Sequence, residues 1–530
     1  MFCHCILAAA FMVEPFEPRT YEEAKNSTSW TEWKDAMGDE VKSLRLNKTW
    51  RLKKRSSVTA SGKHILRGRW VFKIKRAADG GVQKYKARWV VRGFEQVEGS
   101  DYAETFAAVV KPMSYKALFA IAAAMDYEIE QMDVKTAFLY GNVDDEVYVE
   151  QPVGYEEDPD SVCQLDKALY GLKQSPRIWY DTLTKFLRSL GFEALNADLS
   201  VFTRNGMIIA IYVDDLLIAG PSKNDISEIK RALNGRFQMS DLGPCTHYLG
   251  ISVRRDRANR SIYLSQRGYI EKFLKDLGMW DVKTAVTPLD SSRLPEAPQG
   301  YQAADALKSK YQRAVGLLMY AMLGTRPDIA YAVSVVSRFS ANPTTDHWLA
   351  VQRILRYLRG TLDLELAFSG DLRPLVGYSD ADWAGDISTR RSTSGYVFSI
   401  GTGPISWSSK RQSTVSLSTC EAEYIGQTQA TKEAVWLRNL LAELTYMNER
   451  DIPTTIIYGD NQGAIALAKN PKFHGRSKHI DIQHHYVREK VEDRTVGLKY
   501  IETSKQIADG LTKPLSKVPF LQFRKALGLQ

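Results

Sequence analysis

The chain has 530 residues, 44% of them hydrophobic and 25% charged, so it is long enough for several domains and has the composition of a globular protein. It has 71 Lys and Arg against 62 Asp and Glu, and the net charge of +9 favours a polyanionic partner without excluding an ordinary basic enzyme. The five cysteines are scattered and no apolar run is long enough to cross a bilayer, which argues against a disulfide-stapled secreted domain and a membrane protein, so we expect a soluble protein in a reducing compartment.

Patterns in the first half predict the elements that lead to a first candidate site. Apolar residues at helical spacing in 21–46 predict a surface helix, and 69–93 alternates on both sides of Asp79-Gly80-Gly81, which predicts a β-hairpin. A buried helix is predicted by "SYKALFAIAAAMD", and a strand running into a turn by "EIEQMDVKTAFLYG". Asp133 therefore stands near the end of a strand.

A second hairpin is predicted by "MIIAIYVDDLLIAG" (207–220), with Asp214 and Asp215 at or beside its turn. Burying two adjacent carboxylates is costly, because each loses water and the two repel each other. A divalent cation that prefers hard oxygen ligands, such as Mg²⁺, would relieve both costs. The alternative is a plain Asp-Asp turn on an exposed hairpin, and this motif alone does not decide between the two.

Asp133 makes the metal hypothesis stronger, because it adds a carboxylate from a separate strand. Two or three carboxylates from separate strands could hold two metal ions about 3.5–4 Å apart, the arrangement that supports in-line phosphoryl transfer. In such a site one ion activates an attacking 3′-hydroxyl, and the other holds the triphosphate and the leaving pyrophosphate.

The second half begins with a change in composition. Residues 287–302 are rich in Pro, Ser and polar residues, which predicts a linker, and helical patterns follow in 311–358. From Leu375 to about Lys513 the expected order is strands, helix, strand, helix, strand, helix.

Four acids of this region stand at strand ends and helix starts: Asp380, Glu421, Asp460 and Asp509. They could converge on one rim, bind two further Mg²⁺ ions and support hydrolysis of a phosphodiester by a metal-activated water. Each of them alone could instead cap a helix or lie on the surface. Close competitors for the same role are Asp382, Glu423 and Asp386.

The chain resembles the polymerase core of copia-type LTR retrotransposons in three ordered segments, "QMDVKTAFLYG", "LYGLKQSPRIWY" and "IYVDDLLIAG". A further segment, "YKARWVVRGFEQ", resembles the fingers of that family, and the resemblance extends from about Pro18 to Leu515. It implies that Asp133 and Asp214 are the main metal ligands, with Asp215 as a supporting member.

Nucleotide-binding residues also follow from the resemblance. Phe138 matches an aromatic gate that favours deoxynucleotides, although the sequence alone favours a core aromatic. Lys86 and Arg88 share one face of the fingers hairpin, as a basic stripe that could grip a triphosphate or as a solvated strand face. Tyr170 and Lys173 belong to "YGLKQSP", which resembles the segment that packs against the nascent base pair.

The last third resembles the copia-type RNase H domain, in "SDADWAGD", "STCEAEY", "DNQGAIALAKNP", "KHIDIQHHYVRE" and "ADGLTKPL". The resemblance implies that the ordered acids Asp380, Glu421, Asp460 and Asp509 are its catalytic metal ligands. A role in product release stays open for three histidines, whose segment is equally typical of a helix with surface histidines: His479, His484 and His485.

The predicted fold class is α/β and α+β multidomain, with a right-hand polymerase of fingers, palm and thumb followed by an RNase H-like mixed-sheet domain. The expected parts are an atypical N-terminal segment (1–17), fingers and palm (18–260), thumb and connection containing the linker (261–370), an RNase H-like domain (371–515) and a tail (516–530). Motifs of a nucleocapsid knuckle, an aspartic protease and an integrase are missing, which suggests the 3′ part of a polyprotein or a truncated genomic copy.

The resemblance implies an RNA-directed DNA polymerase of a copia-type retrotransposon, with an RNase H that cleaves RNA in RNA–DNA hybrids and two Mg²⁺ ions per active site. Its partners would be an RNA template, a DNA primer, the hybrid and deoxynucleoside triphosphates, with no membrane. We expect it in the cytoplasm, in virus-like particles, or in the nucleus, and its oligomeric state is not defined by the sequence. Two alternatives stay open: an inactive relic that at most binds nucleic acid, and a host-adopted nuclease that uses only the RNase H half.

Overall fold

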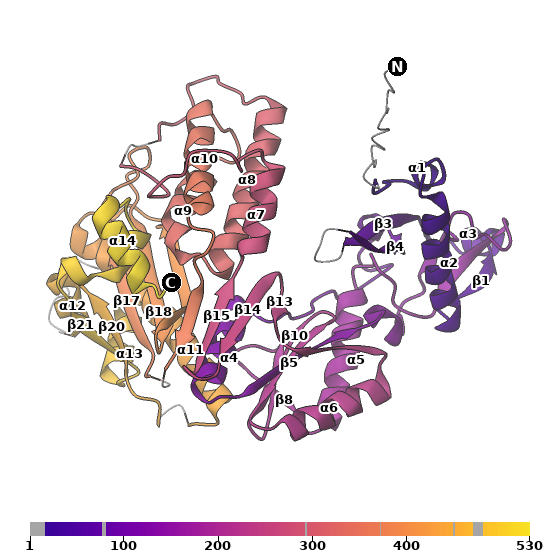
Figure 1. Ribbon diagram of the computed structural model, residues 1–530, viewed down its shortest axis with the longest axis horizontal. Helices are drawn as coiled ribbons and strands as arrows, with labels where there is room; N and C mark the ends of the chain where they lie inside the picture. The colour runs from indigo at the N-terminus through magenta and orange to yellow at the C-terminus, as the bar shows by residue number, and fades with distance from the viewer. Residues whose placement is uncertain (1–15, 77–80, 292–293, 371–372, 449–450, 470–480) are drawn as a thin grey trace, which may run out of the picture. The chain divides into compact units, whose positions relative to one another are not determined.

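The computed structural model describes residues 16–76, 81–291, 294–370, 373–448, 451–469 and 481–530 (Figure 1). The chain forms two compact units, between which it passes repeatedly. Unit 1 is Met1–Val109, Val134–Gly191 and Asn234–Ser240, and unit 2 is Val110–Asp133, Phe192–Leu233 and Asp241–Gln530. In the described residues, we find no helix with the length and apolar character that a membrane crossing requires.

Unit 1 has a four-stranded sheet of order β1-β7-β6-β2 and a two-stranded sheet, β3-β4. Its elements are α1 (Tyr21–Lys25), α2 (Trp30–Leu46), β1 (Trp50–Lys54), α3 (Arg55–Ala60), β2 (Ile65–Leu66), β3 (Gly68–Arg76), β4 (Val82–Val91), η1 (Gly93–Glu95), η2 (Ala137–Tyr140), β6 (Tyr148–Val149), β7 (Ser161–Leu165) and α5 (Ser175–Ser189).

The predicted fingers hairpin is confirmed, since β3 and β4 pair antiparallel. Its turn residues Asp79 and Gly80 lie outside the described residues. Helix α2 packs on the hairpin through the fully buried Trp33, whose ring meets those of Phe72 on β3 and Tyr85 on β4 at centroid distances of 5.1 and 4.7 Å. Edge-to-face contacts of this kind add to the apolar area that the rings bury.

Unit 2 contains three sheets, of order β12-β5-β11-β10-β9-β8, β13-β14-β15-β16 and β19-β18-β17-β20-β21. The first two and their helices comprise α4 (Pro112–Ala124), β5 (Glu128–Val134), β8 (Glu193–Ala194), β9 (Val201–Arg204), β10 (Met207–Tyr212), β11 (Asp215–Gly220), α6 (Lys223–Arg236), β12 (Met239–Pro244), β13 (His247–Tyr248), β14 (Ile251–Asp256), β15 (Ser261–Ser265), α7 (Arg267–Asp276), α8 (Asp305–Gly324), η3 (Pro327–Ile329), α9 (Ala330–Ser337), α10 (Thr345–Arg359) and β16 (Leu366–Ser369). Helices α7 to α10 lie together in Figure 1 and contact one another.

Helix α4 is the predicted buried helix, and it connects the three sheets of unit 2, because it contacts β11, β15, β16 and β19. Apolar residues cover most of its circumference, as expected of a helix with no solvent face. Its Lys116 is also buried: Nζ donates to the Leu323 carbonyl at 2.7 Å and stands 3.6 Å from the centre of the Trp407 ring. Burial lowers the pKa of Lys116 well below its ordinary value.

The third sheet is mixed, as the sequence predicts for this part of the chain. Strand β17 pairs antiparallel with β18 and parallel with β20, and β21 continues the sheet parallel to β20. Helix α11 contacts β17, β18 and β20, and η7 contacts β17 and β18. The bounds are β17 (Val376–Ala381), β18 (Thr393–Ile400), β19 (Gly403–Arg411), α11 (Thr419–Thr445), β20 (Thr455–Gly459), α12 (Gln462–Lys469), α13 (Asp481–Glu492), β21 (Val496–Tyr500), η6 (Thr503–Lys505), η7 (Ile507–Leu511) and α14 (Lys517–Ala526).

A buried ion pair fixes the helices between the sheets. Arg326 donates from Nε and Nη2 to the two carboxylate oxygens of Asp328 at 3.0 and 2.7 Å, and both side chains are inaccessible to solvent or nearly so. Arg326 also donates to the Thr361 carbonyl and hydroxyl, and the Tyr357 hydroxyl donates to Asp328. The network therefore joins the start of η3 to the end of α10.

We expect Arg326→Met to destabilise unit 2 by about 3–5 kcal/mol, because it leaves the Asp328 carboxylate buried without its cation. Urea unfolding followed by far-UV circular dichroism measures the change. The double variant Arg326→Met, Asp328→Leu should recover much of the loss. A matched control, Lys275→Ala in the exposed pair of Lys275 and Glu271, should have little effect. Equal effects of the two single variants would show that burial of the ion pair is not what matters.

Candidate active sites

Three acids of the first candidate site meet at the centre of the six-stranded sheet. Strands β10 and β11 pair from Tyr212 opposite Asp215, so Val213 and Asp214 form the turn of the predicted hairpin. Strand β5 pairs with β11 so that Asp133 lies directly opposite Asp215. Directly opposed residues of antiparallel strands point to the same face, with Cβ atoms about 4.5–5.5 Å apart. The two carboxylates therefore share one face beside the turn that carries Asp214.

The turn is held in an uncommon conformation. Val213 has φ of 57°, which is left-handed and rarely adopted by a β-branched residue. Such strain persists only where the surrounding structure imposes it, as the paired strands on both sides do here. The left-handed Val213 bends the backbone between Tyr212 and Asp215. In a straight strand, Asp214 and Asp215 would instead point to opposite faces.

The surroundings of Asp215 shift its pKa. Burial, together with the charges of Asp133 and Asp214, raises the pKa of Asp215 to about 6, and a hydrogen bond from Gln131 opposes this shift. Gln131 donates from Nε2 to Oδ1 of Asp215 at 2.7 Å. A cation placed among the three carboxylates would act in the same direction as Gln131, so this donor set fits a divalent metal.

Three of the predicted nucleotide-binding residues converge in unit 1. Phe138 is buried, with its ring 4.7 Å from that of Tyr170, and the Arg88 guanidinium stands 4.6 Å from the centre of the same Tyr170 ring. Tyr170 thus contacts both an aromatic and a basic residue of the predicted set. Lys86 lies on the same strand as Arg88. Burial raises the pKa of Glu40, and the charges of Arg88 and Lys86 oppose this shift.

The turn that carries Tyr170 needs a glycine. The Val91 amide at the end of β4 donates to the Tyr170 carbonyl at 2.8 Å. Gly171 follows with φ of 97°, and a Cβ there would lie 2.0 Å from the Val91 carbonyl oxygen. Lys173 donates from Nζ to the Tyr102 hydroxyl at 3.0 Å and to the Gln96 carbonyl at 3.2 Å. Its predicted contact with substrate thus competes with two protein acceptors, and Tyr102 is a neighbour that sequence analysis missed.

The C-terminal carboxylate cluster consists of Asp380, Glu423, Asp460 and Asp509. Among the described residues, Asp380, Asp460 and Asp509 each offer an oxygen, and these atoms lie within 4.8 Å of one another. Asp380 lies near the end of β17, Asp460 follows β20, and Asp509 is in η7. Because β17 and β20 are parallel, their carboxyl ends meet at one edge of the sheet.

Glu423 takes the place at this cluster that the sequence assigned to Glu421. Burial raises the pKa of Glu423 to about 10, with contributions from the charges of Asp380 and Asp460. Its Oε2 atom is buried and has no hydrogen-bond partner in the described part of the chain. Glu421 instead accepts the Leu417 amide at 2.8 Å through Oε2, at the start of α11, which is a capping contact. The structure thus brings together Asp380, Asp460 and Asp509 but not Glu421.

A glycine on β18 leaves the space that η7 needs to approach Asp380. Gly395 on β18 lies opposite Asp380, and a Cβ there would lie 2.7 Å from Cβ of Leu511 and 2.9 Å from Cγ2 of Thr512. The close approach lets the Thr512 hydroxyl donate to Asp380. Lys513 follows, with Nζ 2.9 Å from Oδ1 of Asp509.

The cluster has the chemistry of a divalent-metal site. Burial and the charge of Asp509 raise the pKa of Asp380 to about 7, while Thr512 and Lys513 oppose the shift. The acids outnumber the neighbouring cation Lys513, and Oε2 of Glu423 has no hydrogen-bond partner in the described residues. Hard oxygen donors of this kind suit Mg²⁺.

The other competitors have partners of their own. Asp386 pairs with Arg338 and Arg411, and hydrogen bonds and the Arg411 charge lower its pKa. Asp382 accepts the Thr393 amide, and burial raises its pKa to about 6. His479 lies outside the described residues, as does the side chain of His484, and His485 is an exposed residue of α13.

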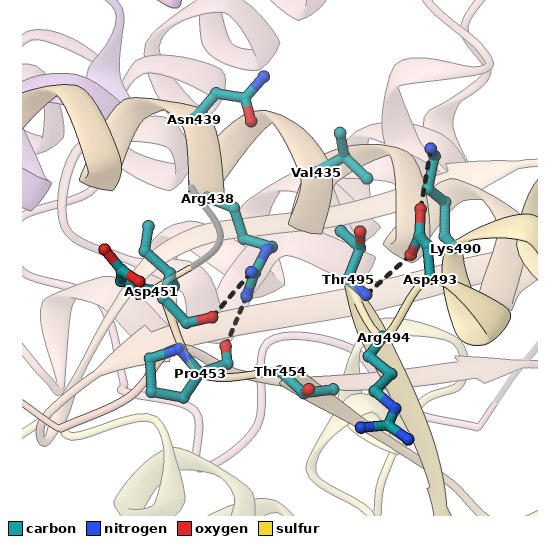
Figure 2. Close-up of a pocket in the computed structure, with 11 residues that line it drawn as sticks. Val435, Arg438, Asn439, Asp451, Pro453, Thr454, Lys490, Asp493, Arg494 and Thr495 are labelled. Atoms are coloured by element: carbon teal, nitrogen blue, oxygen red, sulfur yellow. Dashed lines mark hydrogen bonds and ion pairs between the residues drawn. The ribbon is translucent and has the colours of Figure 1, made fainter. Parts of the chain in front are cut away.

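A cavity of about 590 Å³ opens at the opposite ends of the strands (Figure 2). Thr454 and Thr495, which precede β20 and β21, belong to its lining. Figure 2 shows Arg438 directed at backbone carbonyls, and it donates to those of Ile452 and Pro453. Arg438 therefore stabilises a loop, and the cavity contains none of the predicted site residues.

Comparison with known proteins identifies the family of the chain. Residues 47–291 match the family model described as reverse transcriptase (RNA-dependent DNA polymerase). The chain is 36% identical over 312 residues to the putative transposon Ty5-1 protein of Saccharomyces cerevisiae, covering 57% of this chain and 100% of that protein. It is 42% identical over 526 residues to the retrovirus-related Pol polyprotein from transposon TNT 1-94 of Nicotiana tabacum.

The chain belongs to the Pol polyproteins of copia-type LTR retrotransposons. The match to the tobacco polyprotein covers 97% of this chain but only 39% of that polyprotein. The chain is also 39% identical to the transposon RE2 polyprotein of Arabidopsis thaliana, in a match that covers 97% of this chain and 35% of that polyprotein. Among solved structures it is similar to a foamy viral protease-reverse transcriptase in complex with double-stranded DNA, at 13% identity and a TM-score of 0.45, over 93% of this chain and 72% of that one.

The Glu423 assignment predicts a proton release. At pH 7.5 without divalent cations Glu423 keeps its proton, because that pH lies below its pKa of about 10. Metal ligands must be ionised, so Mg²⁺ binding should release about one proton from Glu423. Calorimetric titration in two buffers of different ionisation enthalpy measures it. Glu423→Gln should abolish this proton release, and the matched control Glu421→Gln should retain it. The reverse result would show that Glu421, and not Glu423, binds the metal.

Proposed function

We propose that this chain is an RNA-directed DNA polymerase with an associated RNase H, each activity using two Mg²⁺ ions. The observation that carries the proposal is the register that sets Asp133 opposite Asp215 beside the Asp214 turn, inside the segment that matches the reverse transcriptase family. Carboxylates from separate strands on one face are what a two-metal nucleotidyl transfer requires.

In polymerisation the three acids would bind the cations, with Asp133 and Asp214 as the main ligands and Asp215 as their support. Bound there, the cations would supply the charge neutralisation that in-line transfer to a phosphoryl group needs. Gln131 orients Asp215 by donating to one of its oxygens. In unit 1, Arg88 would pair with the triphosphate of a deoxynucleotide, with Lys86 and Lys173 adding positive charge.

The aromatic pair Phe138 and Tyr170 in unit 1 would select deoxynucleotides over ribonucleotides. The Phe138 ring is buried against Tyr170, so it has little freedom to move away from a bulkier ligand. A rigid ring at a nucleotide site excludes a 2′-hydroxyl by collision, which would favour deoxynucleotides. Tyr170 in turn is held by Arg88 above its face.

In RNase H cleavage the cluster of Asp380, Glu423, Asp460 and Asp509 would hold the metals, with Glu423 in place of Glu421. Bound metals would supply an activated water for phosphodiester hydrolysis. Thr512 and Lys513 support the cluster by a hydrogen bond and an ion pair with its acids. The partners we propose are an RNA template, a DNA primer, the RNA–DNA hybrid and deoxynucleoside triphosphates.

Primer extension on an RNA template with deoxynucleotides and Mg²⁺ tests the polymerase. The wild-type chain should extend the primer, and Asp214→Asn should reduce extension by more than about 100-fold, because it removes a metal ligand rather than an outer contact. Cleavage of a preformed RNA–DNA hybrid serves as the matched control, since Asp214→Asn should leave it intact.

Asp380→Asn should give the opposite pattern, with hybrid cleavage lost and primer extension kept. A folded wild-type chain that binds template and primer but extends nothing would contradict the polymerase and favour the relic. Hybrid cleavage without extension, indifferent to Asp214→Asn, would favour a host-adopted nuclease.

A further inference from the structure

Three large apolar side chains stand exposed on segments that adjoin the elements of the C-terminal carboxylate cluster. Trp383, Val415 and Leu417 are 52%, 47% and 78% exposed, and we call them the apolar rim. Scattered apolar residues are normal on a protein surface, but grouped ones mark binding surfaces. A hydrogen bond connects the two segments that carry these three side chains, and others hold the segment of Val415 and Leu417.

The first hydrogen bond ties the tryptophan to the other segment. Nε1 of Trp383 donates to the Ser416 carbonyl at 3.2 Å, between Val415 and Leu417 in the chain. The polar edge of the indole is thus satisfied by protein. What remains for solvent is apolar ring surface, whose exposure costs roughly 25 cal/mol per Å².

The second set of hydrogen bonds makes the segment rigid. Gln412 is buried and donates from Nε2 to the Ser394 hydroxyl on β18 and to the Ala422 carbonyl on α11, each at 2.9 Å. It accepts from the Ser416 hydroxyl at 2.9 Å. Glu421 fixes the Leu417 amide at 2.8 Å. Glu421 therefore acts as a positioning residue for the rim.

Both segments of the rim continue into elements that carry the cluster. Trp383 is three residues after Asp380, so their Cα atoms are at most about 11 Å apart. The segment with Val415 and Leu417 leads directly into α11, which carries Glu423. A phosphodiester held at the cluster would bring its neighbouring nucleotides within reach of the rim.

We propose that the apolar rim binds the sugar and base surface of an RNA–DNA hybrid next to the phosphate held at the carboxylate cluster. The inference rests on the proposed RNase H activity and adds a binding surface to it. The three side chains carry no charge, so they cannot pair with phosphates. The C–H surfaces of the sugar rings, which line the wide and shallow minor groove of a hybrid, are the least polar parts that this substrate exposes. The indole ring offers the flat surface that such groups pack against.

Binding of a labelled RNA–DNA hybrid in Ca²⁺, measured by fluorescence anisotropy from 50 to 300 mM KCl, tests the inference. Trp383→Ala should weaken binding by about tenfold, as loss of an aromatic contact to nucleic acid does. The slope of log K against log salt should not change, because no phosphate contact is lost. Trp383→Phe should recover most of the affinity, and hybrid cleavage should show a raised KM with kcat nearly kept.

Leu417→Ala provides a second variant that removes no hydrogen bond, so it decides the question if Trp383→Ala does not fold. It should weaken binding by about threefold, whereas Leu349→Ala, an equally apolar change at an exposed position of α10, should not. Wild-type affinity in both rim variants, or a lower salt slope in Trp383→Ala, would overturn the inference alone. A wild-type chain that binds no hybrid would overturn the proposed RNase H function together with it.

Discussion

Repulsion between buried carboxylates is the constraint on which both sites depend. The four acids of the C-terminal cluster cannot all be ionised in a site with little water: burial, together with the charges of Asp380 and Asp460, raises the pKa of Glu423 to about 10. Asp215 meets the same conflict less severely, because it is only half buried and Gln131 donates to it. A divalent cation bound at either group of acids would relieve this repulsion.

In each site the backbone brings the acids close together despite their repulsion. In the six-stranded sheet the register of two antiparallel pairings fixes Asp133 opposite Asp215, and a left-handed Val213 bends the turn between them. In the RNase H-like sheet, parallel strands bring Asp380 and Asp460 to one edge, and Gly395 leaves space for η7 to add Asp509. In both sites the acids stand on strands or helices or directly beside them.

Motifs with a strong local signal were predictable from the sequence, and contacts between distant segments were not. The Asp214 hairpin, helix α4, the fingers hairpin and the strand before Asp460 follow from apolar periodicity and turn residues. Glu421 and Glu423 lie two apart on one helix, about 200° around its axis, and only the packing of α11 on β17 decides which faces Asp380. The Tyr102 contact of Lys173 spans 71 residues, and no local pattern indicates it.

The most direct test of the account is to locate the metals. Crystals grown with Mn²⁺ in place of Mg²⁺, and examined by anomalous scattering, would show which carboxylates bind it. The account predicts Mn²⁺ at coordination distance from Asp133 and Asp214, and from Asp380, Glu423, Asp460 and Asp509. Ordered Mn²⁺ elsewhere, with no ion at either group of acids, would contradict it.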